Sequence, residues 1–99
     1  MIHVVATSHV KPGCREDFLR ILHANVPNVL AEAGCLQYAP CVDLDGGPRP
    51  AEPDAVTILE TWESLAHLQA HFQAAHMKAF VEAVRDLRVS SSARVVRPA

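Results

Sequence analysis

The hydrophobic pattern of the chain predicts four β-strands. Short runs rich in valine and isoleucine, bounded by proline, glycine or charged residues, fall at residues 2–10, 36–42, 55–62 and 89–96. The second run contains Pro40, which has no N–H to donate to a neighbouring strand. We therefore expect residues 36–42 to lie at an edge of the sheet or to carry a bulge.

A helical period of apolar residues follows the first strand. The helix comes after the turn signal Lys11-Pro12-Gly13, and it has Glu16 and Asp17 in its first turn, where the helix dipole favours acids. Gly34 is a suitable residue to end it, because glycine tolerates the backbone conformation that stops a helix. We expect Pro27, inside this segment, to kink the helix or to split it in two.

A second helical region separates the third strand from the fourth. Ser64 is placed to cap its first helix, and the chain is expected to bend near residues 73–75 before another helix over residues 76–87. The first of these helices carries three apolar residues that we expect to face the core: Leu65, Leu68 and Phe72. This arrangement leaves His71 beside Phe72, at the margin of the apolar face.

The predicted order βαββαβ is that of the ferredoxin-like α+β motif, with a four-stranded antiparallel sheet and helices on one face. A chain of 99 residues fits one domain spanning residues 1–99. Neither face of the sheet is plainly polar, since even the face with His3, Val5 and Thr7 is mixed. We expect a second copy of the chain to cover this face and form a homodimer.

Composition excludes several classes of protein. Hydrophobic residues make up 49% of the chain and charged residues 20%, which is typical of a globular protein. The net charge of −2, without a cluster of lysine and arginine, argues against nucleic-acid and membrane partners. The N-terminus lacks the pattern of a signal peptide, and three cysteines without a CxxC motif indicate reduced thiols, so we expect a cytoplasmic protein.

Histidines are the first candidates for chemistry. His67, His71 and His76 lie in the second helical region, and imidazole can take up and return a proton near neutral pH. The spacing of His67 and His71 could serve a metal, but the glutamate of an HExxH motif is missing, and we expect no metal. The alternative for each histidine is an ordinary surface or half-buried side chain.

Three more residues near these histidines admit two interpretations each. Trp62 is either a core residue or a flat apolar wall for an aromatic ligand. Glu60, on the same face of its strand, is either a structural anchor or a polar group of a pocket, and the anchor is favoured. Tyr38, the only tyrosine, either binds a quinone oxygen or satisfies a backbone group.

The sequence contains none of the common motifs for organic cofactors or nucleophilic catalysis. It has no GxGxxG, Walker A, CxxCH or GxSxG segment. An oxidoreductase built on this chain is therefore expected to hold no organic cofactor tightly, and its substrate must supply the electrons.

One combination of short motifs runs along almost the whole chain. It comprises the segments VPNVLAEAGC at residues 26–35, YAP at 38–40 and VD at 42–43, then ETWES at 60–64, AHL at 66–68, AH at 70–71 and HMKA at 76–79. The pattern E-x-W-x-S…L…H…H resembles the bacterial quinol monooxygenases of the antibiotic-biosynthesis monooxygenase superfamily.

The resemblance implies a dimeric α+β barrel, in which two ferredoxin-like units join sheet to sheet and a pocket lies between the sheet and helices of each. It also implies oxidation of a quinol by dioxygen, as co-substrate, without metal, haem or flavin. Trp62, His71 and His76 match motif positions that line or border this pocket, and Tyr38 matches a tyrosine of the family. The haem-degrading branch has a tryptophan in place of His71, which argues against haem degradation.

The sequence thus predicts a cofactor-independent monooxygenase acting on a quinol or similar phenol. We expect His71, the preferred base, and His76 to be catalytic, and four residues to bind the substrate: Tyr38, Glu60, Trp62 and Phe72. Two alternatives stay open, a dimeric binding or stress-response module for a small hydrophobic ligand and an isomerase of a small oxygenated metabolite.

Overall fold

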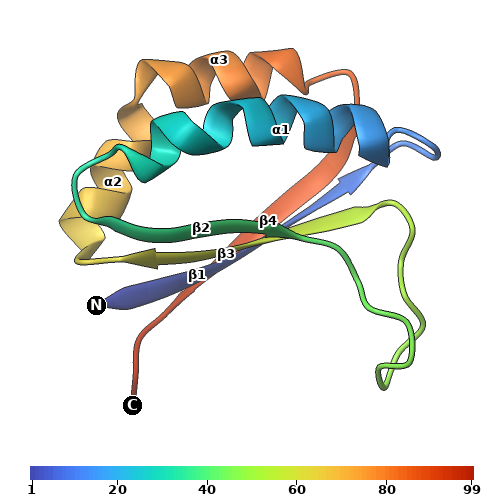
Figure 1. Cartoon of the computed structure of the whole chain (residues 1–99), viewed down its shortest axis with the longest axis horizontal. Coiled ribbons are helices and arrows are strands. Elements are labelled where there is room, and N and C mark those ends of the chain that lie inside the picture. Colours follow the sequence, from blue (N-terminus) through green and yellow to red (C-terminus); the bar gives the residue numbers. More distant parts are fainter.

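The structure, a computed structural model, describes all residues 1–99, and its helices lie together on one face of a single sheet (Figure 1). The elements in chain order are β1 (Ile2–Val10), α1 (Arg15–Leu30), β2 (Cys35–Cys41), β3 (Ala55–Trp62), α2 (Leu65–Gln73), α3 (Ala75–Ala83) and β4 (Arg88–Val96). This arrangement confirms the predicted ferredoxin-like fold. None of the helices is both long and apolar enough to cross a membrane.

The sheet has the strand order β2-β3-β1-β4, and all its neighbouring strands run antiparallel. The strand with Pro40 is an edge strand, as predicted from the missing proline N–H, and its register shifts between Cys35 and Gln37. An exposed loop over residues 42–54 joins β2 to β3 and reaches beyond the sheet on the side away from the helices (Figure 1).

Pro27 does not split the first helix, which runs unbroken to Leu30, so the expectation of two separate pieces is wrong. It lies in the last turn of α1, where the missing N–H removes only one helical hydrogen bond. The turn is closed by the N–H of Ala31, which donates to the carbonyl oxygen of Pro27 over 3.1 Å. Val29, on the same turn, is fully buried and anchors the end of the helix in the core.

The second helical region has the predicted cap and break. The Ser64 hydroxyl accepts a hydrogen bond from the backbone N–H of His67, and Ala74 adopts extended backbone between α2 and α3. The last helix ends at Ala83, earlier than predicted, because the N–H of Leu87 bonds to the carbonyl oxygen of Val84 and turns the chain toward β4.

The helix α2 is rotated relative to the sequence prediction. Leu68 and His71 are buried, whereas Leu65 and Phe72 are about half exposed. Around a helix with 3.6 residues per turn, Leu65 and Phe72 lie on one side of Leu68 and His71 lies on the other. His71 therefore occupies the core position expected for Phe72, because its ring packs against Trp62 and Tyr38.

The sheet face away from the helices is mixed, as the alternation predicted. Val5 and Leu59, paired in register on β1 and β3, are each 40% exposed. Beside them the Nδ1 atom of His3 lies 3.0 Å from the Thr61 hydroxyl, which donates to the Gln37 side chain over 3.2 Å.

Candidate active site

A cavity of about 320 Å³ lies between the helix-covered face of the sheet and the helices α2 and α3. Four of the six predicted site residues line it: Tyr38, Glu60, His71 and Phe72. Its remaining wall is mainly apolar and includes Phe18, Ile58, Met77 and Phe80. A mostly apolar cavity with a few polar groups is the usual form of a small-molecule site.

His71 is the most deeply buried polar residue of this cavity. It is 2% exposed, and its Nδ1 atom lies 2.7 Å from Oε2 of Glu32. Its ring centroid is 4.8 Å from that of Trp62 and 5.7 Å from that of Tyr38. The Nε2 atom makes no hydrogen bond within the chain, so it is the ring nitrogen left for a ligand.

Glu32 reaches His71 because of the turn between α1 and β2. Gly34 has a φ of +80°, and a Cβ atom there would lie 2.3 Å from the ring of His67. The carbonyl oxygen of Gly34 accepts a hydrogen bond of 2.8 Å from the N–H of Glu63, which ties the turn to the end of β3. A residue with a side chain cannot occupy this position without a shift, so glycine allows α2 to pack closely above the turn.

Glu60 and Trp62 act as a pair on β3. They point to the same face of the sheet, and the indole Nε1 of Trp62 donates a hydrogen bond of 2.9 Å to Oε1 of Glu60. Burial raises the pKa of Glu60, while the indole hydrogen bond and His71 act in the opposite direction. Glu60 also lines the cavity, whereas Trp62 is fully buried behind it and does not.

Tyr38 presents a hydroxyl without a hydrogen-bond partner within the chain. It lies on β2 opposite Glu60 and lines the cavity. Burial raises the pKa of Tyr38 well above its usual value, and the nearby carboxylates of Glu60 and Glu32 raise it further. The phenol therefore stays protonated at neutral pH and is suited to donate a hydrogen bond.

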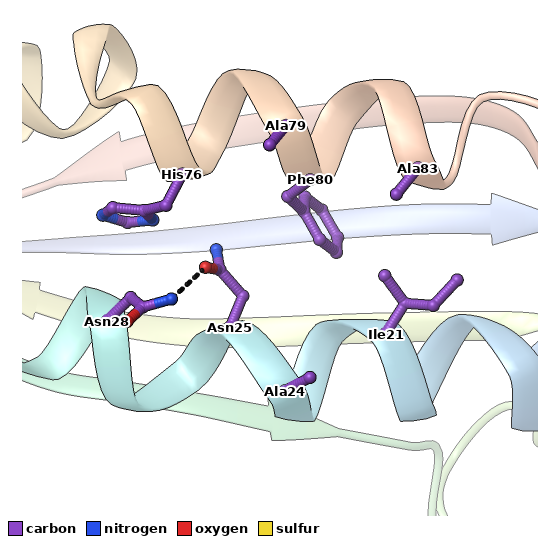
Figure 2. Close-up of a pocket in the computed structure, with 8 residues that line it drawn as sticks. All are labelled: Ile21, Ala24, Asn25, Asn28, His76, Ala79, Phe80 and Ala83. Carbon is purple, nitrogen blue, oxygen red and sulfur yellow. Dashed lines mark hydrogen bonds between the residues drawn. The ribbon is translucent and has the colours of Figure 1, made fainter.

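His76 lies apart from the cavity. Its ring, on α3, lines a groove of about 280 Å³ between α1 and α3 (Figure 2). Figure 2 shows Asn25 and Asn28 of α1 across this groove, where the Asn28 amide donates to the Asn25 side chain over 3.1 Å. The Nε2 atom of His76 lies 3.3 Å from Oε2 of Glu32, although without the geometry of a hydrogen bond.

Sequence reasoning missed Glu32. One signal existed, because an acidic residue just after the end of a helix is unfavourable next to the helix dipole and calls for a separate reason. It also missed the cavity residues of β4, which include Arg88 and Ser91. Nothing marks those positions until the register of β4 against β1 is known.

The pair His67 and His71 does not form part of a ligand cluster. The Nδ1 atom of His67 lies 2.7 Å from the Ser64 hydroxyl, and Nδ1 of His71 is held by Glu32. The chain gathers no group of three or more histidine, cysteine, aspartate or glutamate side chains that could hold a metal ion.

Comparisons with known proteins identify the family of the chain. The model of the family described as antibiotic biosynthesis monooxygenase matches residues 1–83. An Escherichia coli K12 protein named "Probable quinol monooxygenase YgiN" is 40% identical over 102 aligned positions, which cover 99% of this chain and 98% of the relative.

Solved structures give the same fold. The crystal structure of PA3566 from Pseudomonas aeruginosa matches with a TM-score of 0.83 and 28% identity, covering 99% of this chain and 94% of that one. A conserved protein from Methanosarcina mazei matches with a TM-score of 0.86 and 24% identity, covering 99% and 92%.

Proposed function

The chain belongs to the antibiotic biosynthesis monooxygenase family and is a monooxygenase in this general sense, and on that premise we propose that it oxidises a quinol or a similar electron-rich phenol with dioxygen. The name of the E. coli relative supports the quinol as substrate class. The observation that carries the proposal is His71, a fixed imidazole whose unbonded Nε2 belongs to an apolar cavity.

In the proposed reaction His71 is the base. Its Nε2 atom removes a hydroxyl proton from the bound quinol, and the Glu32 carboxylate on Nδ1 fixes the ring and stabilises the positive charge that forms. The quinol anion is a much better electron donor than the neutral quinol and reduces dioxygen. Tyr38 donates a hydrogen bond to the second substrate oxygen, and Phe72 contacts the ring at the cavity wall.

The atoms and electrons of this reaction balance without another reductant. The quinol loses four electrons, since both O–H bonds and one ring C–H bond break. One oxygen atom of dioxygen enters the product as a new hydroxyl group, and the other leaves as water with two protons. If the quinol gives up only two electrons, the products are quinone and hydrogen peroxide.

Oxygen uptake with a quinol tests the proposal, measured with an electrode and corrected for autoxidation. We choose His71→Asn because the shorter amide can still donate to Glu32 but has no group at the place of Nε2. Quinol-dependent uptake is expected to fall by ~10²–10⁴-fold, the usual contribution of a general base. The matched control is His67→Asn, since His67 contacts Ser64 and does not line the cavity.

The outcomes separate the proposed function from its alternatives. Uptake by His71→Asn equal to that of the parent removes His71 from the mechanism. A parent that binds quinols but consumes no oxygen above the uncatalysed rate is a binding module. Conversion of an oxygenated metabolite into an isomer, without oxygen uptake, identifies an isomerase.

A further inference from the structure

One carboxylate oxygen lies between two imidazole rings. Oε2 of Glu32 is 2.7 Å from Nδ1 of His71 and 3.3 Å from Nε2 of His76. The three residues come from the turn after α1, from α2 and from α3, so the fold brings them together from distant parts of the sequence. His71 lines the cavity and His76 lines the groove between α1 and α3, which makes Glu32 the link between two hollows of the molecule.

The ring of His76 makes no hydrogen bond that would explain its position in the fold. Both of its ring nitrogens are buried and neither makes a hydrogen bond, although the side chain as a whole is 25% exposed. Burying a polar nitrogen without a partner is unfavourable, so such a group calls for an explanation other than stability. The distance of 3.3 Å is close enough that a small rotation of the ring would complete a hydrogen bond to Glu32.

The proposed reaction leaves a positive charge on His71, and Glu32 and His76 are placed to take it up. A proton taken from the quinol makes His71 a cation at a mainly apolar cavity, where burial disfavours the charge and the Glu32 carboxylate offsets that cost only in part. While that charge stays on His71, it also holds back the electron that the quinol anion must give to dioxygen. A route that moves the charge away from the cavity removes both obstacles.

We propose that Glu32 and His76 form a proton relay that carries this charge from His71 to the groove between α1 and α3. The proton from the substrate arrives on Nε2 of His71, the Nδ1 proton passes to Oε2 of Glu32, and a proton passes from Glu32 to Nε2 of His76. The relay runs backwards when Nε2 of His71 protonates the reduced oxygen, so no net proton is consumed. The relay rests on the proposed function, because it needs His71 to act as the base.

Chemical rescue of His76→Ala tests the relay. The variant opens the groove beside Glu32 at the place of the missing ring, and small side chains such as Ala79 line the same groove, so a small ring can enter it. We expect kcat for quinol oxidation to fall about 10²-fold, with little change in KM, and to recover when imidazole is added. Pyrazole has the same shape but is a far weaker base, and it is expected to restore nothing.

Three results would overturn the relay. Equal kcat of His76→Ala and the parent shows that no proton needs to reach this residue. Equal rescue by imidazole and pyrazole shows that the ring only fills space. Rescue by imidazole that persists in the double variant Glu32→Gln/His76→Ala shows that the proton does not pass through Glu32.

A second measurement tests whether His71 and His76 are coupled through Glu32, which the relay requires, even if the parent oxidises no quinol. The ring nitrogens of His71 are followed by NMR through a pH titration of the parent and of His76→Gln. Coupling through Glu32 predicts that the titration midpoint of His71 shifts on this substitution, and that the shift disappears in the Glu32→Gln background. No shift contradicts the relay. The other titratable groups around Glu32 stay in every variant and cancel in the comparison: Cys35, Tyr38 and Glu60.

Discussion

Glu60 is a buried carboxyl group that has one hydrogen-bond donor, the indole of Trp62. Burial raises its pKa above the usual value of 4.5, so the folded protein binds this proton more tightly than the unfolded chain does. Its contribution to stability is therefore complete below pH 4.5 and is lost as the pH rises through the raised pKa.

We expect Glu60→Gln to remove that loss, because the amide oxygen still accepts from Trp62 but carries no charge. The difference in melting temperature between the variant and the parent should move in favour of the variant from pH 4 to pH 8. Thermal unfolding across this range measures it. A difference that moves toward the parent as the pH rises contradicts the assigned direction of the pKa.

Tyr38 allows binding to be separated from stability. Its hydroxyl has no partner in the chain, so Tyr38→Phe is expected to change the free energy of unfolding by less than about 0.5 kcal/mol, as for substitutions that remove no interaction. If the hydroxyl bonds to a substrate oxygen, kcat/KM for the quinol falls roughly 2–10-fold, which corresponds to one hydrogen bond. Oxygen uptake and thermal unfolding on the same sample test both parts, and unchanged kcat/KM would show that the Tyr38 hydroxyl does not bind the substrate.

Single residues were predictable where strand alternation or a motif marked them. Glu60 and Trp62 share a strand face two residues apart, and the structure places Glu60 both against the Trp62 indole and in the cavity wall. Glu32 could not be found in this way. Its partner His71 is 39 positions away, and their contact depends on the shape of a turn.

At the scale of elements, the turn between α1 and β2 controls the packing of α2. Gly34→Ala introduces a Cβ atom 2.3 Å from the His67 ring at a position with positive φ. Gly13 has a similar φ of +79° but no atom within 4 Å of the added Cβ, so Gly13→Ala is the matched control.

Both substitutions are expected to cost about 1–2 kcal/mol for the backbone conformation, and Gly34→Ala about 1–3 kcal/mol more for the overlap with His67. In a domain of this size each kcal/mol lowers the melting temperature by about 4–8 °C. Thermal unfolding of the two variants measures the difference. Equal losses in both would mean that α2 moves away from the turn without cost.

The order of the elements followed from periodicity, but their details depended on contacts between them. Four strands and the Ser64 cap were predictable from local pattern. The continuity of α1 past Pro27 and the rotation of α2 could not be predicted in this way. Each depends on the core residues against which the buried side of the helix packs. The buried side chain of Val29 anchors the last turn of α1, and the ring of His71 packs against Trp62 in the core.

At the scale of the whole molecule, the mixed sheet face supports the predicted homodimer. Val5 and Leu59 expose apolar surface at its centre. We expect the parent to be a dimer in light scattering at micromolar concentration, with more than about 1,000 Å² of total buried surface. Leu59→Arg, which places a charge on this face, should give a monomer.

The control is Leu30→Arg, because Leu30 is an exposed leucine at the end of α1, on the helix-covered side of the sheet. This variant should stay dimeric. A monomeric parent rules out the prediction, and a dimeric Leu59→Arg protein moves the interface elsewhere.

The exposed loop over residues 42–54 divides the chain into two segments, one with the acidic member of the Glu32 cluster and one with its two histidines. The piece before it, β1-α1-β2, holds the acid Glu32, and the piece after it, β3-α2-α3-β4, holds the imidazoles of His71 and His76. The strand order interleaves the pieces, since β3 lies between β2 and β1, and β1 between β3 and β4. We therefore expect fragment complementation: after a cut between Gly46 and Gly47, each half alone should show no quinol-dependent oxygen uptake, and uptake should return only as the halves reassemble.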